Sequence, residues 1–153
     1  MKKKRFLTLE EYYDDVAKVP TLYVDGASRG NPGVSGIGYC ICDENGVVLK
    51  KGGEFIGLAN SRVAEYYAMR YGIEIALEMG LKYMRICADN LMMVKQLNGV
   101  FKVKNRDIRP IYRDIKRILR RLKGVAVVHV DREMNTIADR EANSAIDEMW
   151  RTT

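Results

Sequence analysis

The sequence predicts an α/β fold in which helices cover a mixed β-sheet. Three apolar segments rich in strand-forming residues come first, at 21–25, 36–43 and 47–56. Later segments of the same kind alternate with longer ones whose apolar residues recur every three or four positions, as in a helix. Strands joined by a tight turn pair antiparallel, whereas strands joined through a helix pair parallel. A sheet with both kinds of pairing is therefore expected.

Turn signals separate the first three strands. The glycine-rich segment 26–33 predicts a loop, because glycine and Pro32 favour tight turns. Asn45 and Gly46 lie between two apolar runs and predict a hairpin in which both central residues tolerate positive φ.

The rest of the chain predicts helices and strands in alternation. A long helix over 61–79 ends where Gly80 fits the position that follows a helix. Its expected buried stripe consists of Ala64, Ala68, Tyr71, Ile75 and Met79. The other expected elements are a strand at 84–88, a short helix at 90–98, a helix at 107–122, a strand at 125–130 and a last helix, capped by Asn135, that ends near Trp150.

The length of 153 residues fits one main domain preceded by a short extension. Residues 1–20 are expected to form this extension, with a short helix that begins at a capping-box pair, Thr8 and Glu11, and ends at Pro20. The main domain then spans 21–153.

Composition argues against a membrane protein and against a secreted, disulfide-rich protein. No apolar run is long enough to span a bilayer, and no signal-peptide pattern follows the basic start. Cys40, Cys42 and Cys87 form no C-x-x-C motif, so reduced and mostly buried thiols are expected. These observations predict a cytoplasmic protein without membrane partners, and we expect a monomer.

Positive charge concentrates in one part of the chain. The net charge is +6, and the segment 102–123 contains ten basic residues opposed only by Asp107 and Asp114. Apolar residues spaced at three and four positions give this segment an amphipathic helix with a cationic outer face. Such a face is either a solvated surface or a surface that follows the phosphates of a nucleic acid.

Four acidic residues stand where folding does not require them. Asp25 and Asp89 each end a predicted strand, and two strand ends side by side form a natural site in an α/β sheet. A single such aspartate is commonly only a turn residue. Glu65 and Asp139 lie in the first turns of two helices, beside apolar residues that face the core, so both could lean over the same edge of the sheet. Clustered carboxylates repel one another unless cations compensate them, and oxygen ligands suit Mg²⁺ or Mn²⁺.

The order and spacing of these motifs resemble the type 1 ribonuclease H family across residues 21–150. The similarity rests on four stretches: Asp25-Gly-x-x-x-Gly-Asn-Pro-Gly33, Ala64-Glu65-Tyr66, Ala88-Asp89 and Asn135-x-x-Ala138-Asp139-x-x-Ala142-Asn143. The chain looks most like the compact, archaeal-like subgroup that lacks the basic handle loop and the catalytic-loop histidine.

This resemblance implies a ribonuclease H-like fold with a five-stranded mixed sheet, and makes 21–153 the catalytic domain. It implies an endonuclease that hydrolyses the RNA strand of RNA/DNA hybrids with two ions, leaving 5′-phosphate and 3′-hydroxyl ends. Asp25 would bridge the ions, Glu65 and Asp89 would bind the ion on the leaving-group side, and Asp139 the ion on the water side.

The resemblance also suggests substrate contacts. Gly30 and Asn31 match a family position that contacts the hybrid, and double-stranded RNA is a further candidate substrate. Asn60-Ser61-Arg62 replaces the family's usual Thr-Asn-Asn, which puts the finer contacts of Asn60 in doubt, although Arg62 could still reach a phosphate. Arg132 could touch the scissile phosphate or assist product release, or form a simple salt bridge. His129 lies within a predicted strand, so we interpret it as a packed or edge-strand residue rather than as a proton shuttle.

Two other functions remain open at this point. Integrases, transposases and junction resolvases share this fold and process DNA. A catalytically silent module that binds hybrids or a protein is the second alternative, although a surface that only binds polyanions gains nothing from four carboxylates.

Overall fold

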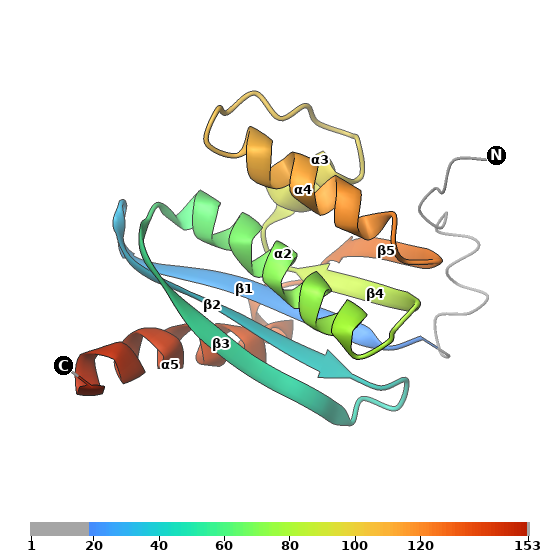
Figure 1. Cartoon of the computed structure of the whole chain (residues 1–153), viewed down its shortest axis with the longest axis horizontal. Helices are drawn as coiled ribbons and strands as arrows, with labels where there is room; N and C mark the ends of the chain where they lie inside the picture. The colour runs from blue at the N-terminus through green and yellow to red at the C-terminus, as the bar shows by residue number, and fades with distance from the viewer. Residues whose placement is uncertain (1–18, 153) are drawn as a thin grey trace.

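A five-stranded mixed sheet lies at the centre of the protein (Figure 1). The computed structural model describes residues 19–152, so the helix expected within 1–20 lies outside the described residues. The strand order is β3-β2-β1-β4-β5, in which β1 pairs antiparallel with β2 and parallel with β4. This confirms the predicted mixed sheet. The strands are β1 (Thr21–Gly30), β2 (Gly33–Cys42), β3 (Val48–Ala59), β4 (Tyr83–Ala88) and β5 (Gly124–His129).

Helices cover both faces of the sheet (Figure 1). They are α2 (Ser61–Glu78), α3 (Leu91–Leu97), α4 (Arg109–Leu119) and α5 (Thr136–Thr152), with a short 3-10 helix, η2 (Arg132–Met134), before α5. Helices α2, α3 and α4 lie over one face, and α5 packs against β1, β2 and β3 on the other. None of the described helices combines the length and the apolar character needed to cross a membrane.

The main hydrophobic core fills the space between the sheet and helices α2 to α4. Leu22 and Ile86 from the strands meet Ile73 of α2 and Ile115 of α4, and all four are at most 1% exposed. Burying one such side chain stabilises the fold by about 1.5–3 kcal/mol. The buried residues of α4 are Ile111, Ile115 and Leu119, which confirms the predicted amphipathic helix.

The glycine-rich segment 26–33 is mostly strand, and the predicted loop was wrong. Strand β1 continues to Gly30 and β2 begins at Gly33, so only Asn31 and Pro32 form the turn. The strands stay paired to the tip, where the Ser28 and Ser35 hydroxyl oxygens lie 2.6 Å apart in a hydrogen bond. Gly26 leaves room for the backbone of α2, whereas Gly30, with a φ of +111°, turns the chain before Asn31.

The turn between β2 and β3 also differs from the prediction. Gly46 has a φ of +82°, but no non-glycine residue in the described part of the chain has a positive φ, so Asn45 does not share this conformation. The turn begins at Asp43, whose Oδ1 accepts hydrogen bonds from the backbone N–H groups of Asn45 and Val47, each at 2.9 Å. These hydrogen bonds to the Asp43 side chain stabilise the turn with one residue of positive φ, whereas a two-residue hairpin of the predicted kind would need two.

The buried face of α2 is displaced from the predicted stripe. Ala64 and Ala68 are buried as expected, but Met79 is 36% exposed and Tyr71 and Ile75 are only partly buried. The fully buried positions are Ala64, Tyr66, Ala68, Met69, Gly72, Ile73 and Ala76. The helix lies flat on the sheet with Gly72 against β1, so its buried face is broader than one stripe.

Helix α5 approaches the sheet closely at Gly38 of β2. A Cβ at Gly38 would stand 2.5 Å from the Ala142 nitrogen, so only glycine lets the two backbones come this near. This contact fixes the height of α5, and therefore of Asp139, above the sheet.

The cysteines and the single histidine lie as predicted. The three thiols are free and buried. His129 is the last residue of edge strand β5 and is exposed.

Candidate metal centre

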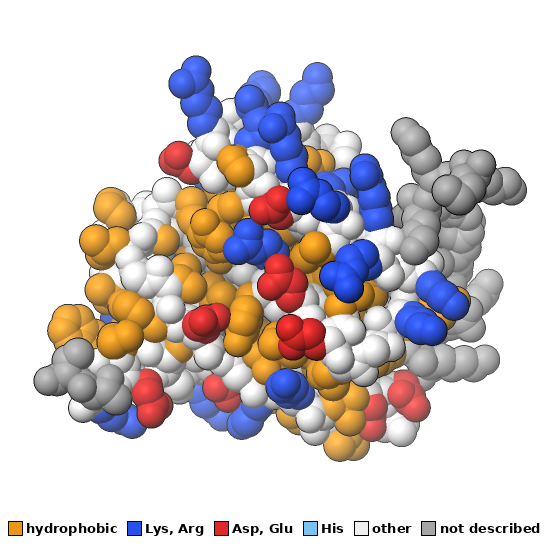
Figure 2. Space-filling view, in the orientation of Figure 1, with side chains coloured by type: hydrophobic (Ala, Val, Ile, Leu, Met, Phe, Trp, Pro, Cys, Tyr) orange, Lys and Arg blue, Asp and Glu red, His pale blue; other side chains and the backbone are white. Residues whose placement is uncertain are grey.

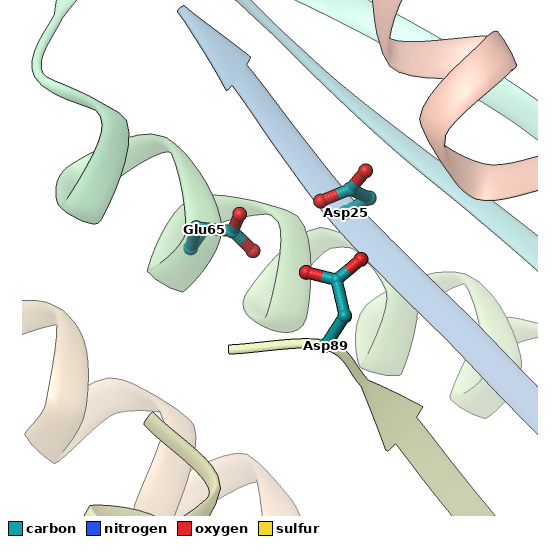
Figure 3. Close-up of side chains that lie close together, drawn as sticks. All are labelled: Asp25, Glu65 and Asp89. Carbon is teal, nitrogen blue, oxygen red and sulfur yellow. The ribbon is translucent and has the colours of Figure 1, made fainter. Parts of the chain in front are cut away.

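Three carboxylates meet at the carboxyl end of β4, beside the middle of β1 (Figure 3). The prediction that Asp25 ends its strand was wrong, because β1 continues to Gly30. The parallel register pairs Tyr23 with Cys87, and Asp25 and Asp89 each follow two residues later. Glu65 reaches the same point from α2. One carboxylate oxygen from each of these three residues lies within 4.8 Å of the other two. The fold therefore gathers acids that are separated by up to 64 positions in the sequence.

Glu65 reaches this point because α2 lies against the backbone of β1. A Cβ at Gly26 would stand 2.6 Å from both the Ala64 carbonyl oxygen and the Glu65 nitrogen. A residue with a side chain would push the helix away. A backbone hydrogen bond from Gly26 also reaches the Glu65 carboxylate and lowers its pKa.

Burial and repulsion between neighbouring carboxylates raise the pKa values of Asp25 and Glu65. Burial raises the pKa of Asp25 far above its ordinary value, and the charges of Glu65 and Asp89 raise it further. Burial and the charge of Asp89 likewise raise the pKa of Glu65, opposed by hydrogen bonds with Asp25 and Gly26 and by the charge of Arg132. Without a cation, Asp25 and Glu65 therefore keep their protons to a higher pH than ordinary carboxyl groups do.

The donor set fits a hard divalent cation. Oε2 of Glu65 is buried and has no hydrogen-bond partner among the described residues, which is costly unless a ligand satisfies it. All three ligating groups are carboxylates, and neither a histidine nor a cysteine belongs to the cluster. Mg²⁺ and Mn²⁺ prefer such oxygen ligands, whereas zinc prefers nitrogen and sulfur.

Asp139 and Arg132 line the same pocket, which has a volume of about 470 Å³ and also contains Asp25, Glu65 and Asp89. Asp139 is exposed and stands outside the group of three, but a hydrogen bond with it raises the pKa of Asp25. The amide of Asn143 holds Asp139, with Nδ2 donating to its carbonyl oxygen at 3.0 Å and to Oδ1 at 3.3 Å. Arg132 is exposed on η2.

The residues predicted to contact substrate form a second cluster. Asn31, Asn60 and Arg62 line one pocket of about 350 Å³ together with Pro32 and Ser61. Gly30 is not among the lining residues, although it directly precedes Asn31 at the end of β1. The Asn31 Oδ1 accepts from Ser61 N at 3.2 Å, and the Asn60 Oδ1 caps α2 by accepting from Val63 N at 2.8 Å.

Asn135 contributes to the metal centre in a way that the sequence did not reveal. Its predicted role as a side-chain cap of the last helix was wrong. Although its backbone carbonyl accepts from Asp139 N at 3.1 Å, its side-chain Nδ2 donates to the Val24 carbonyl at 2.8 Å and to Asp89 Oδ2 at 3.1 Å. The Asn135 Oδ1, which would have to accept the capping hydrogen bond, has no partner among the described residues. The amide instead turns its Nδ2 toward two acceptors that only the fold brings near.

Comparison with known proteins places this geometry in a family. A profile of the reverse transcriptase-like family matches residues 23–145. Ribonuclease HI of Halobacterium salinarum is 33% identical over 126 residues, which are 82% of this chain and 63% of that protein. A bifunctional protein of Mycobacterium tuberculosis is 34% identical over 124 residues, 80% of this chain and 34% of that protein. The chain thus spans less than two thirds of the length of these curated relatives.

Solved structures agree with the sequence relatives. The crystal structure of RNase H1 from Halobacterium salinarum has a TM-score of 0.82 at 32% identity, over 84% of this chain and 98% of that one. LC11-RNase H1, isolated from compost by a metagenomic approach and solved in complex with an RNA/DNA hybrid, has a TM-score of 0.81 at 34% identity, over 86% and 99% of the two chains.

Proposed function

The chain belongs to the type 1 ribonuclease H family, and from this premise we propose that it is an endonuclease that hydrolyses the RNA strand of RNA/DNA hybrids with two divalent cations. The observation that carries the proposal is the convergence of Asp25, Glu65 and Asp89 from three separate elements. A folded protein gains nothing from burying mutually repelling acids unless they serve a ligand.

Four carboxylates are the proposed cation ligands: Asp25, Glu65, Asp89 and Asp139. When bound, Mg²⁺ or Mn²⁺ would activate a water and stabilise the leaving oxygen during in-line displacement at phosphorus. The protein's part is to hold the acids at one point and to release the protons of Asp25 and Glu65 when the cations arrive. The products would carry 5′-phosphate and 3′-hydroxyl ends.

Hybrid recognition is proposed for Asn31, Asn60 and Arg62. Each amide oxygen already accepts a backbone N–H of α2, which leaves the Nδ2 groups of Asn31 and Asn60 as the proposed donors to a ligand. They would donate to acceptors in the minor groove of the hybrid, where 2′-hydroxyls distinguish RNA from DNA. Arg62 would hold a phosphate, and Gly30 would shape the approach to Asn31. The hybrid complex of LC11-RNase H1 supports this substrate class.

Arg132 is proposed to act at the scissile phosphate or in product release. It lines the acidic pocket, and its charge lowers the pKa of Glu65. A guanidinium at this place can pair with a phosphate without competing for the cations.

A side-by-side cleavage assay tests the proposal. Equal lengths of RNA/DNA hybrid, double-stranded RNA and double-stranded DNA, each end-labelled, are incubated with Mg²⁺ or Mn²⁺ and compared with the Asp25→Asn variant. We expect cleavage of the RNA strand of the hybrid, lost in the variant, and the same assay reports whether double-stranded RNA is also cut. Cleavage of DNA alone would indicate a DNA-processing nuclease, and binding without cleavage under either cation would indicate a silent module. Either result would reject the proposal.

A further inference from the structure

We propose that Asn135 is a positioning residue that sets Asp89 against Asp25 before any cation binds. The inference rests on the proposed metal centre and extends it beyond the carboxylates. Asn135 is 1% exposed and lies at the start of α5, where its side chain meets the middle of β1 and the residue that follows β4.

The two contacts of the Asn135 side chain fix its orientation chemically. The Val24 carbonyl and the Asp89 carboxylate are both hydrogen-bond acceptors, so the NH₂ group, with two donors, must face them. The reversed amide would place its oxygen against two other oxygens. Oδ1 of Asn135 is buried without a partner among the described residues, which makes the arrangement costly. The structure thus leaves the acceptor of this amide unused while its NH₂ group donates to the β1 backbone and to Asp89.

The contacts of Asn135 reach three of the four proposed ligands. Val24 directly precedes Asp25, so the 2.8 Å hydrogen bond to its carbonyl holds the β1 backbone beside Asp25. The 3.1 Å hydrogen bond to Oδ2 restrains the Asp89 carboxylate itself. The Asn135 carbonyl accepts from the backbone N–H of Asp139, which ties the first turn of α5 to the same point.

A residue with these contacts should lower the free-energy cost of holding the carboxylates together and of binding a cation. A hydrogen bond to the charged form of Asp89 partly offsets the repulsion from Asp25 and Glu65. A carboxylate that is already oriented loses less freedom when a cation binds. Removing the Asn135 amide should therefore reduce the free energy of cation binding more than it reduces the free energy of unfolding.

The test compares Asn135 with another asparagine that makes a similar contact. Asn98 Nδ2 donates to the Val127 carbonyl of β5 at 3.0 Å and has no contact with a proposed ligand. Asn135→Leu removes the donors with little change of volume, Asn135→Ala removes them with the side chain, and Asn98→Leu and Asn98→Ala are the controls. Mn²⁺ binding is measured by calorimetry on the substrate-free protein, with Asp25→Asn to identify heat that arises at the centre and circular dichroism to verify folding.

We expect Mn²⁺ affinity to fall about 10–100-fold in both Asn135 variants, as for other residues that orient metal ligands, and to change less than about twofold in the Asn98 variants. In cleavage assays the Mn²⁺ concentration for half-maximal rate should rise by the same factor, while the KM for hybrid at saturating Mn²⁺ stays unchanged.

Mn²⁺ affinity within twofold of wild type in a folded Asn135 variant would overturn the proposal, as would an equal loss of affinity in the Asn98 variants. Wild-type protein whose Mn²⁺ binding does not depend on Asp25 would also overturn it. Binding at Asp25 that depends on Asn135, in a protein that cuts no hybrid, would uphold this inference and reject the proposed function.

Discussion

The backbone of Gly26 lies against Glu65 so closely that a Cβ at Gly26 would stand 2.6 Å from the Glu65 nitrogen. This contact brings Glu65 on α2 within reach of Asp25 on β1. Gly26 immediately follows Asp25 in the chain. The position of Glu65, one proposed ligand, therefore depends on the absence of a side chain next to Asp25, another proposed ligand.

Gly26→Ala should displace α2 from β1 and separate Glu65 from Asp25. The new methyl group meets backbone atoms that cannot rotate away, so we expect a loss of about 1–3 kcal/mol in the free energy of unfolding and weaker Mn²⁺ binding. Chemical denaturation and calorimetry measure the two effects. Gly72→Ala is the matched control, because its Cβ would meet the Val24 and Leu22 side chains of β1, which can shift. Mn²⁺ affinity that falls equally in both variants would contradict the assigned role of Gly26.

Asp89→Asn should abolish cleavage while leaving the protein folded and able to bind hybrid. The amide keeps the size of the side chain but removes a charge that the cations need. We expect a loss of cleavage of at least about a thousandfold, or 4 kcal/mol of transition-state stabilisation. Single-turnover cleavage and hybrid binding in Ca²⁺ are compared with Glu44→Gln, an exposed acid in the β2–β3 turn. Unchanged turnover in Asp89→Asn would rule out the proposed centre.

Much of the fold could be predicted because its signals are local. The strand-forming segments and the amphipathic pattern of α4 depend on neighbouring residues, and Ile111, Ile115 and Leu119 are buried as the pattern requires. The glycine-rich segment failed because glycine has two uses. It can bend a chain, or it can leave room for another backbone, and only the tertiary structure shows that Gly30 serves the first use and Gly26 the second.

The candidate site was predictable in part for a similar reason. Aspartates that follow apolar segments, such as Asp25 and Asp89, are visible in the sequence, and the order of the motifs suggested their convergence, although β1 continues past Asp25 to Gly30. The burial of Asn135 and its two acceptors depend on residues 46 and 111 positions away, so the sequence pattern indicated only a helix cap. Site chemistry that depends on such long-range contacts needs coordinates.

Divalent cations should stabilise the protein more at higher pH. Folding raises the pKa of Asp25 and of Glu65, so the contribution of these two groups to the stability of the metal-free protein is fully present only below the ordinary carboxylate pKa of about 4. This stability is lost as the pH rises through the raised values, because the folded state must then bury repelling charges. A cation at one hundred times its Kd adds about 2.7 kcal/mol.

Thermal unfolding with and without Mg²⁺ at pH 6 and pH 8 measures this effect. We expect the Tm gain from Mg²⁺ to be larger at pH 8, and metal-free Asp25→Asn to be more stable than wild type at that pH. A gain that is independent of pH, or metal-free Asp25→Asn that is less stable than wild type at pH 8, would show that the acids are not under the electrostatic strain inferred here.

The basic face of α4 should contribute to hybrid binding through phosphate contacts. Figure 2 shows Lys and Arg side chains gathered over this region, at the top of the view. Arg113 and Arg117 are exposed on α4, and Arg117 is 75% exposed while it pairs with Asp114 at 3.6 Å.

Each phosphate contact contributes about 0.9 to the slope of log affinity against log salt. The double variant Arg113→Glu/Arg117→Glu should therefore weaken binding and flatten the slope by about two. Fluorescence anisotropy with labelled hybrid, in Ca²⁺ and over a range of salt concentrations, measures the slope. Lys50→Glu/Lys82→Glu makes the same change of net charge on two exposed residues outside α4, so a general effect of charge would alter both slopes equally. An unaltered slope in the α4 variant would make this face a solvated surface with no part in substrate binding.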